Sequence, residues 1–331
     1  MTDLWTRSAI THGVPWHERI AAALACYALE PDTSARLVTL SENATYLVRE
    51  PRTGRCRIMR LHRPGYRSIG QIESELEWMV ALKESGAARV ADIMRTRGGE
   101  RVARLACGNG GEEQFAVLFE FLHGENPDEN NLQAIAARMH EQAAQWRRPP
   151  GFTRMEMDID YAIGPRGFWG YWGANRAIDD SLYDLLSIAE QRLRADLRQY
   201  GGQGAHFGLT HCDMRAANLI MCRRVLHVID FDDCADTWQM YELAGFLSFR
   251  EAEMDISACA GRWLNAYAAH RPLTEADLRC IPALIMTRRL LLVGWFATHG
   301  HTVEVREMGN AFVEASRTVA RRYLDGSLIT L

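Results

Sequence analysis

The pattern of apolar residues changes near residue 124, and this change limits the folds that the chain can adopt. Before it, short runs rich in β-branched and aromatic residues are separated by turn residues, and residues 69–86 interrupt them with helical spacing. After it, long segments with the spacing of amphipathic helices dominate. We therefore predict an α+β fold with two lobes, residues 1–123 and a larger, mainly helical lobe over residues 124–331.

The first lobe is predicted to be a five-stranded antiparallel sheet with one inserted helix. After an amphipathic opening helix, residues 36–49 are expected to form a β-hairpin that turns at residues 41–43. Residues 56–63 alternate as a third strand, and residues 101–124 supply two more strands around a glycine-rich turn.

Composition limits the class of partner. With 331 residues, 47% of them hydrophobic, and a formal net charge of -4, the sequence is that of a soluble globular protein. Without a basic surplus, nucleic acid and membrane surfaces are not expected as partners, whereas a small molecule is. Nothing in the sequence indicates the oligomeric state.

The cysteines and the apolar segments indicate the compartment. Eight cysteines without a C-x-x-C pair favour reduced thiols in the cytoplasm over zinc or disulfides. The first residues lack the basic and apolar regions of a secretory signal. Segment 281–298 carries Arg288 and Arg289 near its centre, so it is predicted to be a buried helix and not a membrane span.

One segment, residues 210–233, gathers acidic and amide side chains around a predicted hairpin: THCDMRAANLIMCRRVLHVIDFDD. Its spacing, His211-x-Asp213-x-x-x-x-Asn218 and then Asp230, is typical of phosphoryl transfer. In that chemistry Asp213 holds the acceptor hydroxyl and takes its proton, while Asn218 and Asp230 offer oxygen ligands to magnesium. The alternative, that these polar residues form a surface turn followed by a capped strand, explains the two spaced motifs less well than phosphoryl transfer does. For His211 we expect a structural role.

Together with the following WQMYELAGFLSF, these motifs resemble the catalytic loop, metal site and next helix of the aminoglycoside phosphotransferase and choline kinase superfamily. The resemblance covers most of the chain. It implies a protein-kinase-like fold with a nucleotide-binding first lobe and a second lobe that carries the catalytic loop, the metal site and the acceptor pocket. It implies Asp213 as the catalytic residue, Asn218 and Asp230 as metal ligands, ATP or GTP with Mg²⁺ as cofactors, and a small-molecule hydroxyl as acceptor.

The first lobe of such an enzyme needs a cation for the nucleotide phosphates and an acidic partner on the inserted helix. Arg60 and Glu75 are the candidates, although the resemblance implies a lysine where Arg60 stands. Arginine keeps the charge but is bulkier than lysine, and the chain uses arginine almost throughout, since Lys83 is its single lysine. The alternative is that Arg60 is only an exposed strand charge.

Two further contacts with the nucleotide follow from the resemblance. The loop around Ser41 and Asn43 has no glycine, and its backbone amides are expected to contact phosphate, although a plain hairpin turn is equally compatible with the sequence. The strand AVLFEFLHGE resembles the hinge, where the backbone of Glu120 and Leu122 meets adenine.

A cluster of aromatic residues is the candidate acceptor site: Phe168, Trp169, Tyr171 and Trp172. Aromatic faces near an acid such as Asp179, Asp180 or Glu242 would suit a cationic amine. Core packing or a lid is the favoured alternative, because aromatic side chains mostly serve burial.

We therefore predict a cytoplasmic O-phosphotransferase that moves the γ-phosphate of ATP or GTP to a small molecule such as an amino alcohol, amino acid, sugar or aminoglycoside. The alternatives are a protein serine/threonine kinase of the same superfamily and a nucleotide-binding protein with little catalysis. Asp232 follows Phe231 where protein kinases have glycine, and no A-P-E motif follows, which favours a small acceptor. The presence of Asp213, Asn218 and Asp230 together favours catalysis.

Overall fold

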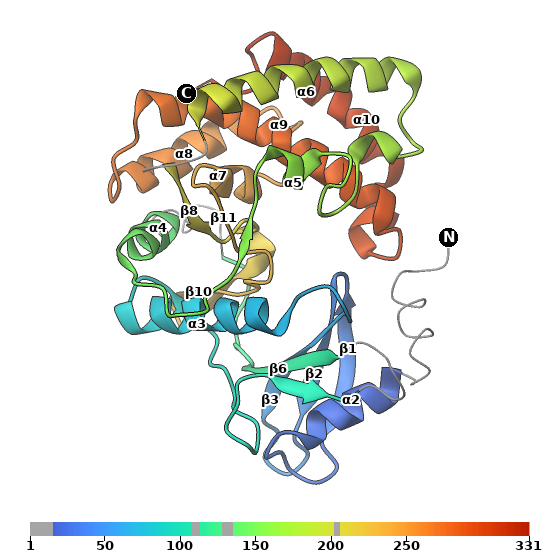
Figure 1. Ribbon diagram of the computed structural model, residues 1–331, viewed down its shortest axis with the longest axis vertical. Helices are drawn as coiled ribbons and strands as arrows, with labels where there is room; N and C mark the ends of the chain where they lie inside the picture. Colours follow the sequence, from blue (N-terminus) through green and yellow to red (C-terminus); the bar gives the residue numbers. More distant parts are fainter. Residues whose placement is uncertain (1–15, 107–112, 128–134, 202–205, 331) are drawn as a thin grey trace. The chain divides into compact units, whose positions relative to one another are not determined.

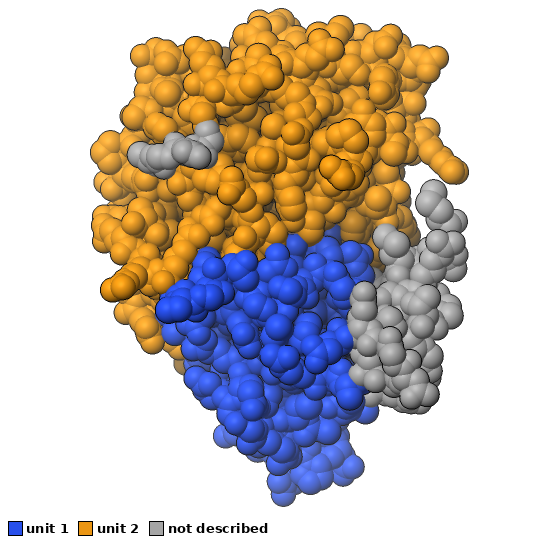
Figure 2. Space-filling view, viewed as in Figure 1, with its two compact units in different colours: residues 1–80, 90–123, 149–153 blue, residues 81–89, 124–148, 154–331 orange. Residues whose placement is uncertain are grey.

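The structure, a computed structural model, describes residues 16–106, 113–127, 135–201 and 206–330. The chain divides into two compact units, shown in different colours in Figure 2. The first combines residues 1–80, 90–123 and 149–153, and the second combines residues 81–89, 124–148 and 154–331. The units are thus interleaved along the sequence, and the two predicted lobes stay a prediction.

The first unit is built on an antiparallel sheet with the strand order β1-β2-β3-β6-β5 (Figure 1). Its strands are β1 (Ser34–Leu40), β2 (Asn43–Arg49), β3 (Cys56–His62), β5 (Ala103–Leu105) and β6 (Gln114–Glu120). Helix α2 (Trp16–Ala25) precedes the sheet, α3 (Ile69–Ser85) follows β3, and the two-residue strand β4 (Arg89–Val90) follows α3. The predicted five-stranded sheet with an inserted helix is confirmed. The predicted glycine-rich turn, at residues 107–112, lies outside the described residues.

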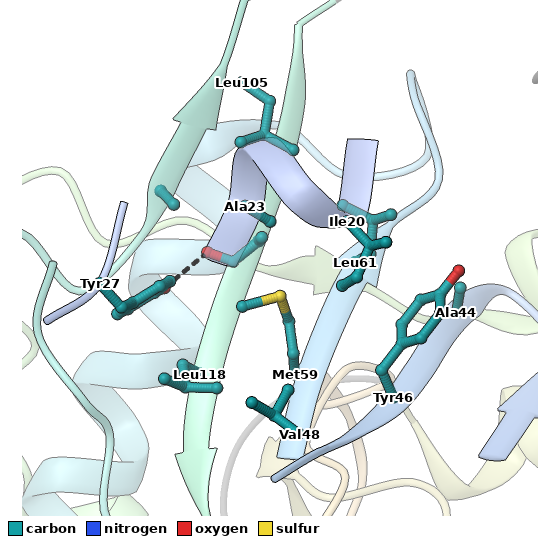
Figure 3. Packing of buried hydrophobic residues seen from close by; sticks show 12 residues of the cluster. Ile20, Ala23, Tyr27, Ala44, Tyr46, Val48, Met59, Leu61, Leu105 and Leu118 are labelled. Carbon is teal, nitrogen blue, oxygen red and sulfur yellow. Dashed lines mark hydrogen bonds between the residues drawn. The ribbon is translucent and has the colours of Figure 1, made fainter. Parts of the chain in front are cut away.

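One buried apolar cluster of the first unit lies on one face of this sheet. Side chains of β2 alternate, so Tyr46 and Val48 are buried while the residues beside them are less so. With Met59 of β3 and apolar residues of α2, they form one buried cluster (Figure 3). The hydroxyl of Tyr27, just after α2, donates to the carbonyl oxygen of Ala116 in β6 at 3.2 Å. This bond satisfies a buried polar group and ties the chain after α2 to the sheet.

The second unit is mainly helical (Figure 1). Its helices are α4 (Ile135–Gln145), α5 (Ile159–Ile163), α6 (Asp180–Tyr200), α7 (Tyr241–Phe246), α8 (Ile256–Ala268), α9 (Glu275–Thr298) and α10 (Val303–Leu324), with 3₁₀ turns η2 (Trp172–Ala174) and η4 (Ala216–Asn218). Strands β7 (Met155–Glu156), β11 (Ala235–Trp238) and β8 (Phe207–Thr210) form one sheet in that order, and β9 (Leu219–Cys222) and β10 (Val225–Val228) form a hairpin. The predicted α+β class is confirmed.

Helix α9 is the central helix of the second unit, because it packs against α5, α6, α7 and α10. It begins with a capping box, in which Thr274 and Asp277 exchange hydrogen bonds between side chain and backbone. By length and composition α9 could cross a membrane, but 89% of its apolar window is buried inside the protein. Burial on all sides explains why the helix has no polar face.

Arg289 of α9 forms a buried ion pair and also hydrogen-bonds to α10. Nη1 of Arg289, in the middle of α9, lies 2.9 Å from Oε2 of Glu251, and Nε donates to Oγ of Ser316 in α10 at 2.8 Å. The side chains of Arg289 and Glu251 are 1% and 0% exposed. Helix α10 is kinked at Gly309, where φ is 51° and ψ is -142°. Glycine adopts this backbone conformation far more readily than any other residue.

Candidate active site

The phosphoryl-transfer motif lies on two segments of the second unit. The first follows β8 and contains Asp213 and Asn218, and the second follows β10 and contains Asp230. The hairpin β9–β10 brings them together. Its two-residue turn, 223–224, has positive φ at both positions, as a type I′ turn requires. Directly after β10, the N–H of Ile229 donates to the carbonyl oxygen of Asn218 at 3.0 Å.

Asp213 has three polar neighbours in this unit. Its Oδ1 accepts a hydrogen bond from Nη2 of Arg288 at 2.5 Å. Its Oδ2 accepts one from Nδ2 of Asn218 at 2.8 Å and lies 3.4 Å from Nε of Arg215. The side chain is 14% exposed, so the carboxylate is held in one orientation and still reaches solvent. Such a carboxylate can accept a hydrogen bond from an acceptor hydroxyl.

His211 ties the two segments together and is fully buried. Its Nδ1 accepts a hydrogen bond from the N–H of Asp213 at 3.3 Å, and its Nε2 lies 3.0 Å from the carbonyl oxygen of Ile229. Because Nδ1 is the acceptor, the ring proton is on Nε2 and is donated to Ile229. The ring also packs edge to face against Phe231, with 4.7 Å between centroids. All of these contacts are structural.

Arg288 of α9 is a site residue that the sequence pattern does not reveal. Its side chain is 3% exposed and, besides Asp213, donates to Oγ of Ser248 at 2.8 Å. Its Cζ lies 5.3 Å from the ring centroid of Trp169. Burial acts to lower the pKa of Arg288, but Tyr241 and Asp213 raise it on balance. The one sequence signal was a charge inside an apolar helix, which needs a buried partner.

The acids considered for binding an amine have other partners. Glu242 is fully buried, where its Oε2 accepts the N–H of His211 at 2.9 Å and lies 3.4 Å from Nε2 of His140. Asp179 caps α6, and its Oδ2 lies 3.2 Å from Nη2 of Arg317. Both carboxylates thus have partners within the second unit, and the binding of an amine by Asp179, Asp180 or Glu242 stays a prediction.

The aromatic cluster has the contacts of a packed core. Trp169 and Trp172 are buried, and Nε1 of Trp172 donates to Oε2 of Glu190 at 2.7 Å. Phe168 stacks on Tyr161 with 5.2 Å between ring centroids. These contacts agree with core packing, the alternative that the sequence favoured.

The side chains of Asn218 and Asp230 fit a hard cation such as Mg²⁺. Because Nδ2 of Asn218 donates to Asp213, its Oδ1 is left without a donor among the described residues. Asp230 is an exposed carboxylate. Within the described ranges, no group of three or more His, Cys, Asp or Glu side chains is placed to hold a metal ion. The available oxygens therefore suit a cation that also takes phosphate and water ligands, as Mg²⁺ does.

In the first unit, the predicted phosphate-binding pair, Arg60 and Glu75, forms a buried ion pair. Nη2 of Arg60 lies 2.7 Å from both carboxylate oxygens of Glu75, and the side chains are 6% and 0% exposed. Cζ of Arg60 also lies 5.3 Å from the ring centroid of Phe119 in β6. Arg60 is thus not an exposed strand charge. Its binding of phosphate stays a prediction.

The other predicted nucleotide contacts lie at two strand ends of the first unit. At the β1–β2 turn, the N–H of Ser41 donates to the carbonyl oxygen of Asn43 at 3.0 Å, and Oδ1 of Asn43 accepts the N–H of Arg63 at 3.4 Å. At the end of β6, Glu120 is exposed and Leu122 is buried. No other described residue hydrogen-bonds to the main chain of Leu122. Contact of these residues with a nucleotide stays a prediction.

Comparison with known proteins identifies the class of this chain. The model of the phosphotransferase enzyme family matches residues 36–276, a range that includes Arg60 and the whole motif from His211 to Asp230. The chain belongs to this family. The predicted membership is confirmed, and so is the predicted enzyme class, a phosphotransferase with an alcohol group as acceptor.

Three individual proteins are similar to this chain over most of its length. The structure of a microcompartment-associated aminopropanol kinase is 33% identical, with a TM-score of 0.86 over 95% of this chain and 99% of that chain. An amicoumacin kinase in complex with AMP-PNP and Ca²⁺ is 18% identical, with a TM-score of 0.73 over 96% of both chains, and shares the fold. An uncharacterized protein of Deinococcus radiodurans is 24% identical over 270 residues, which are 78% of this chain and 75% of that protein.

Proposed function

We propose that this protein transfers the γ-phosphate of ATP to the hydroxyl group of a small amino alcohol. The observation that carries the proposal is the carboxylate of Asp213, held by Arg288 and Asn218 and still accessible to an acceptor. The family supports the reaction class. The likeness to an aminopropanol kinase supports an acceptor with a hydroxyl and an amine close together.

The reaction follows from the arrangement around Asp213. The acceptor oxygen forms a bond to the γ-phosphorus, while the bond from this phosphorus to the β–γ bridging oxygen breaks and ADP leaves. Oδ2 of Asp213 accepts a hydrogen bond from the acceptor hydroxyl, orients it and takes its proton as the new bond forms. Arg288 keeps the carboxylate from rotating by holding Oδ1.

Asn218 and Asp230 are the residues that would hold Mg²⁺, which when bound neutralises charge on the phosphates. We assign nucleotide binding to the first unit. There Glu75 holds the Arg60 guanidinium for the α- and β-phosphates. The main chain of Leu122, to which no other described residue hydrogen-bonds, suits hydrogen bonds to adenine, together with Glu120. The amides around Ser41 and Asn43 cover the phosphates.

The test is ADP release by the purified protein with Mg²⁺ and a panel of acceptors. We expect release with 1-amino-2-propanol and ethanolamine, and much less with 1,2-propanediol, a matched diol that lacks the amine. GTP in place of ATP tests the nucleotide preference. Release that depends on a sugar or a peptide and ignores the amino alcohols would contradict the proposed acceptor, and absence of acceptor-dependent release with the whole panel would contradict the proposed reaction.

A further inference from the structure

We propose that Arg215 is a catalytic residue that binds the phosphoryl group during its transfer. This inference rests on the proposed function and goes beyond it, because it assigns a residue to the reacting phosphoryl oxygens. Two arginines flank Asp213, one at each carboxylate oxygen: Arg288 at Oδ1 and Arg215 at Oδ2. Their surroundings differ in a way that separates their roles.

The Arg288 guanidinium is buried and hydrogen-bonded within the protein. Its three guanidinium nitrogens all donate to described residues, including Asp213 and Ser248, and its side chain is 3% exposed. Leaving these partners would leave the partly buried carboxylate of Asp213 and several buried acceptors without their donor, which is unfavourable. Four of the five N–H groups of Arg288 are therefore used within the protein, and this buried guanidinium keeps Asp213 in place.

The Arg215 side chain is available by contrast. It is 30% exposed, its Nε lies 3.4 Å from Oδ2 of Asp213, and its Nη1 lies 3.8 Å from Oε1 of Glu304. Both distances exceed the range of about 2.7–3.2 Å that is usual for N–H···O hydrogen bonds. Among the described residues, none accepts a hydrogen bond from this guanidinium. Its Cζ lies 5.6 Å from the ring centroid of Phe249, so the guanidinium also contacts an aromatic side chain.

The backbone fixes where this side chain begins. The N–H of Arg215 donates to the carbonyl oxygen of Asp213 at 2.8 Å, and its own carbonyl oxygen accepts the N–H of Asn218 at 2.9 Å. An acceptor hydroxyl bonded to Oδ2 of Asp213 would bring the phosphoryl oxygens to within roughly 4 to 5 Å of that atom. Nε of Arg215 lies 3.4 Å from the same atom, so a side-chain rotation without a backbone movement would bring its donors to the phosphoryl group.

The chemistry of transfer gives these donors a function. As the bond from the acceptor oxygen to the γ-phosphorus forms and the bond to the β–γ bridging oxygen breaks, charge lies on the three equatorial phosphoryl oxygens. The acceptor proton passes to Asp213, and ADP carries away the electron pair of the broken bond. Two N–H groups of Arg215 donate to the equatorial oxygens and stabilise this charge, which a permanently charged, forked side chain does well.

The first measurement compares the turnover of Arg215→Gln, Arg215→Lys and a matched control, Arg198→Gln, on the exposed part of α6. Arg215→Gln should lower kcat by about 100-fold or more, while the KM for the acceptor and the Kd for Mg·ADP change by less than about threefold. Arg215→Lys keeps the charge but loses the forked guanidinium, so its kcat should lie between those of the wild type and Arg215→Gln. Arg198→Gln should match the wild type.

The second measurement is binding of Mg·ADP with aluminium fluoride, which stands in for the phosphoryl group in transfer. In wild type the fluoride complex should bind more tightly than Mg·ADP, and Arg215→Gln should remove most of this difference. Equal weakening of both complexes would indicate a structural role, and a raised acceptor KM at unchanged kcat would indicate acceptor binding, so either result overturns the proposal. If wild type and Arg198→Gln both bind Mg·ADP but release no ADP with any acceptor, the phosphotransfer function fails, and with it the role of Arg215.

Discussion

The two oxygens of Asp213 have different partners, and this determines what its replacement does. In Asp213→Asn, the amide oxygen still accepts the hydrogen bond from Arg288, but the group no longer takes a proton. We expect turnover to fall by about 10²- to 10⁴-fold, with little change in the Kd for Mg·ADP. Steady-state kinetics and calorimetric titration measure the two effects. Undiminished turnover in a folded variant would remove Asp213 from the mechanism.

The residues of the candidate catalytic loop could be grouped from the sequence because their relation is local. Asp213, Asn218 and Asp230 lie on one hairpin and its two ends, so their spacing in the sequence is almost their arrangement in space. Arg288 follows Asp213 by 75 positions, and no pattern of neighbours links the two. The two arginines in the apolar segment indicated only that they need buried partners. Where the Arg288 side chain lies depends on the packing of α9 against α7, which the sequence does not reveal.

The Arg60–Glu75 pair gives a second prediction for single residues. Arg60→Met leaves a fully buried carboxylate without its cation and should lower the free energy of unfolding by about 3–5 kcal/mol. The double variant Arg60→Met, Glu75→Leu removes both charges and should recover most of this loss. Denaturant unfolding of the three proteins measures it. Equal unfolding free energies for wild type and Arg60→Met would show that the pair contributes nothing to stability.

At the scale of elements, the two adjacent arginines of α9 point in different directions and bind different partners. Successive residues of a helix point about 100° apart, so Arg288 faces Asp213 while Arg289 faces Glu251 and α10. The helix is buried on nearly all sides, so its sequence shows no amphipathic period from which these faces could be read. Its burial, by contrast, was predicted from the apolar run around the two arginines.

Two helical glycines, one in α10 and one in α8, should respond to replacement by alanine with opposite changes in the free energy of unfolding. A Cβ at Gly309 would meet nothing within 4 Å, so Gly309→Ala changes only the strained backbone and should lower the free energy of unfolding by about 1–3 kcal/mol. A Cβ at Gly261 in α8 also meets nothing, and no positive φ opposes it. Gly261→Ala should raise the free energy of unfolding by roughly 0.5–1 kcal/mol. Denaturant unfolding compares them. A stabilising Gly309→Ala would mean that the kink is absent in solution.

At the scale of the whole molecule, the bound nucleotide should stabilise the native chain by mass action. Mg·ATP at about 100 times its Kd adds about 2.7 kcal/mol to the free energy of unfolding, so the melting temperature should rise with its concentration. Asp230→Ala should weaken the magnesium dependence of this rise, because it removes a proposed ligand. Thermal scans with and without a chelator test both effects. If the melting temperature of Asp230→Ala depended on the magnesium concentration as that of the wild type does, Asp230 would not be a magnesium ligand.

The proposed position of Arg60 beside the nucleotide phosphates also determines how this protein should respond to chemical labelling. Reagents that carry ATP to a kinase and acylate the lysine beside its phosphates need a nucleophilic amine there. A guanidinium stays protonated at every usable pH and does not attack such reagents. The single amine-bearing side chain of the chain, Lys83, lies in the last turn of α3. A survey of kinases by lysine acylation would therefore pass over this protein even when its nucleotide site is full.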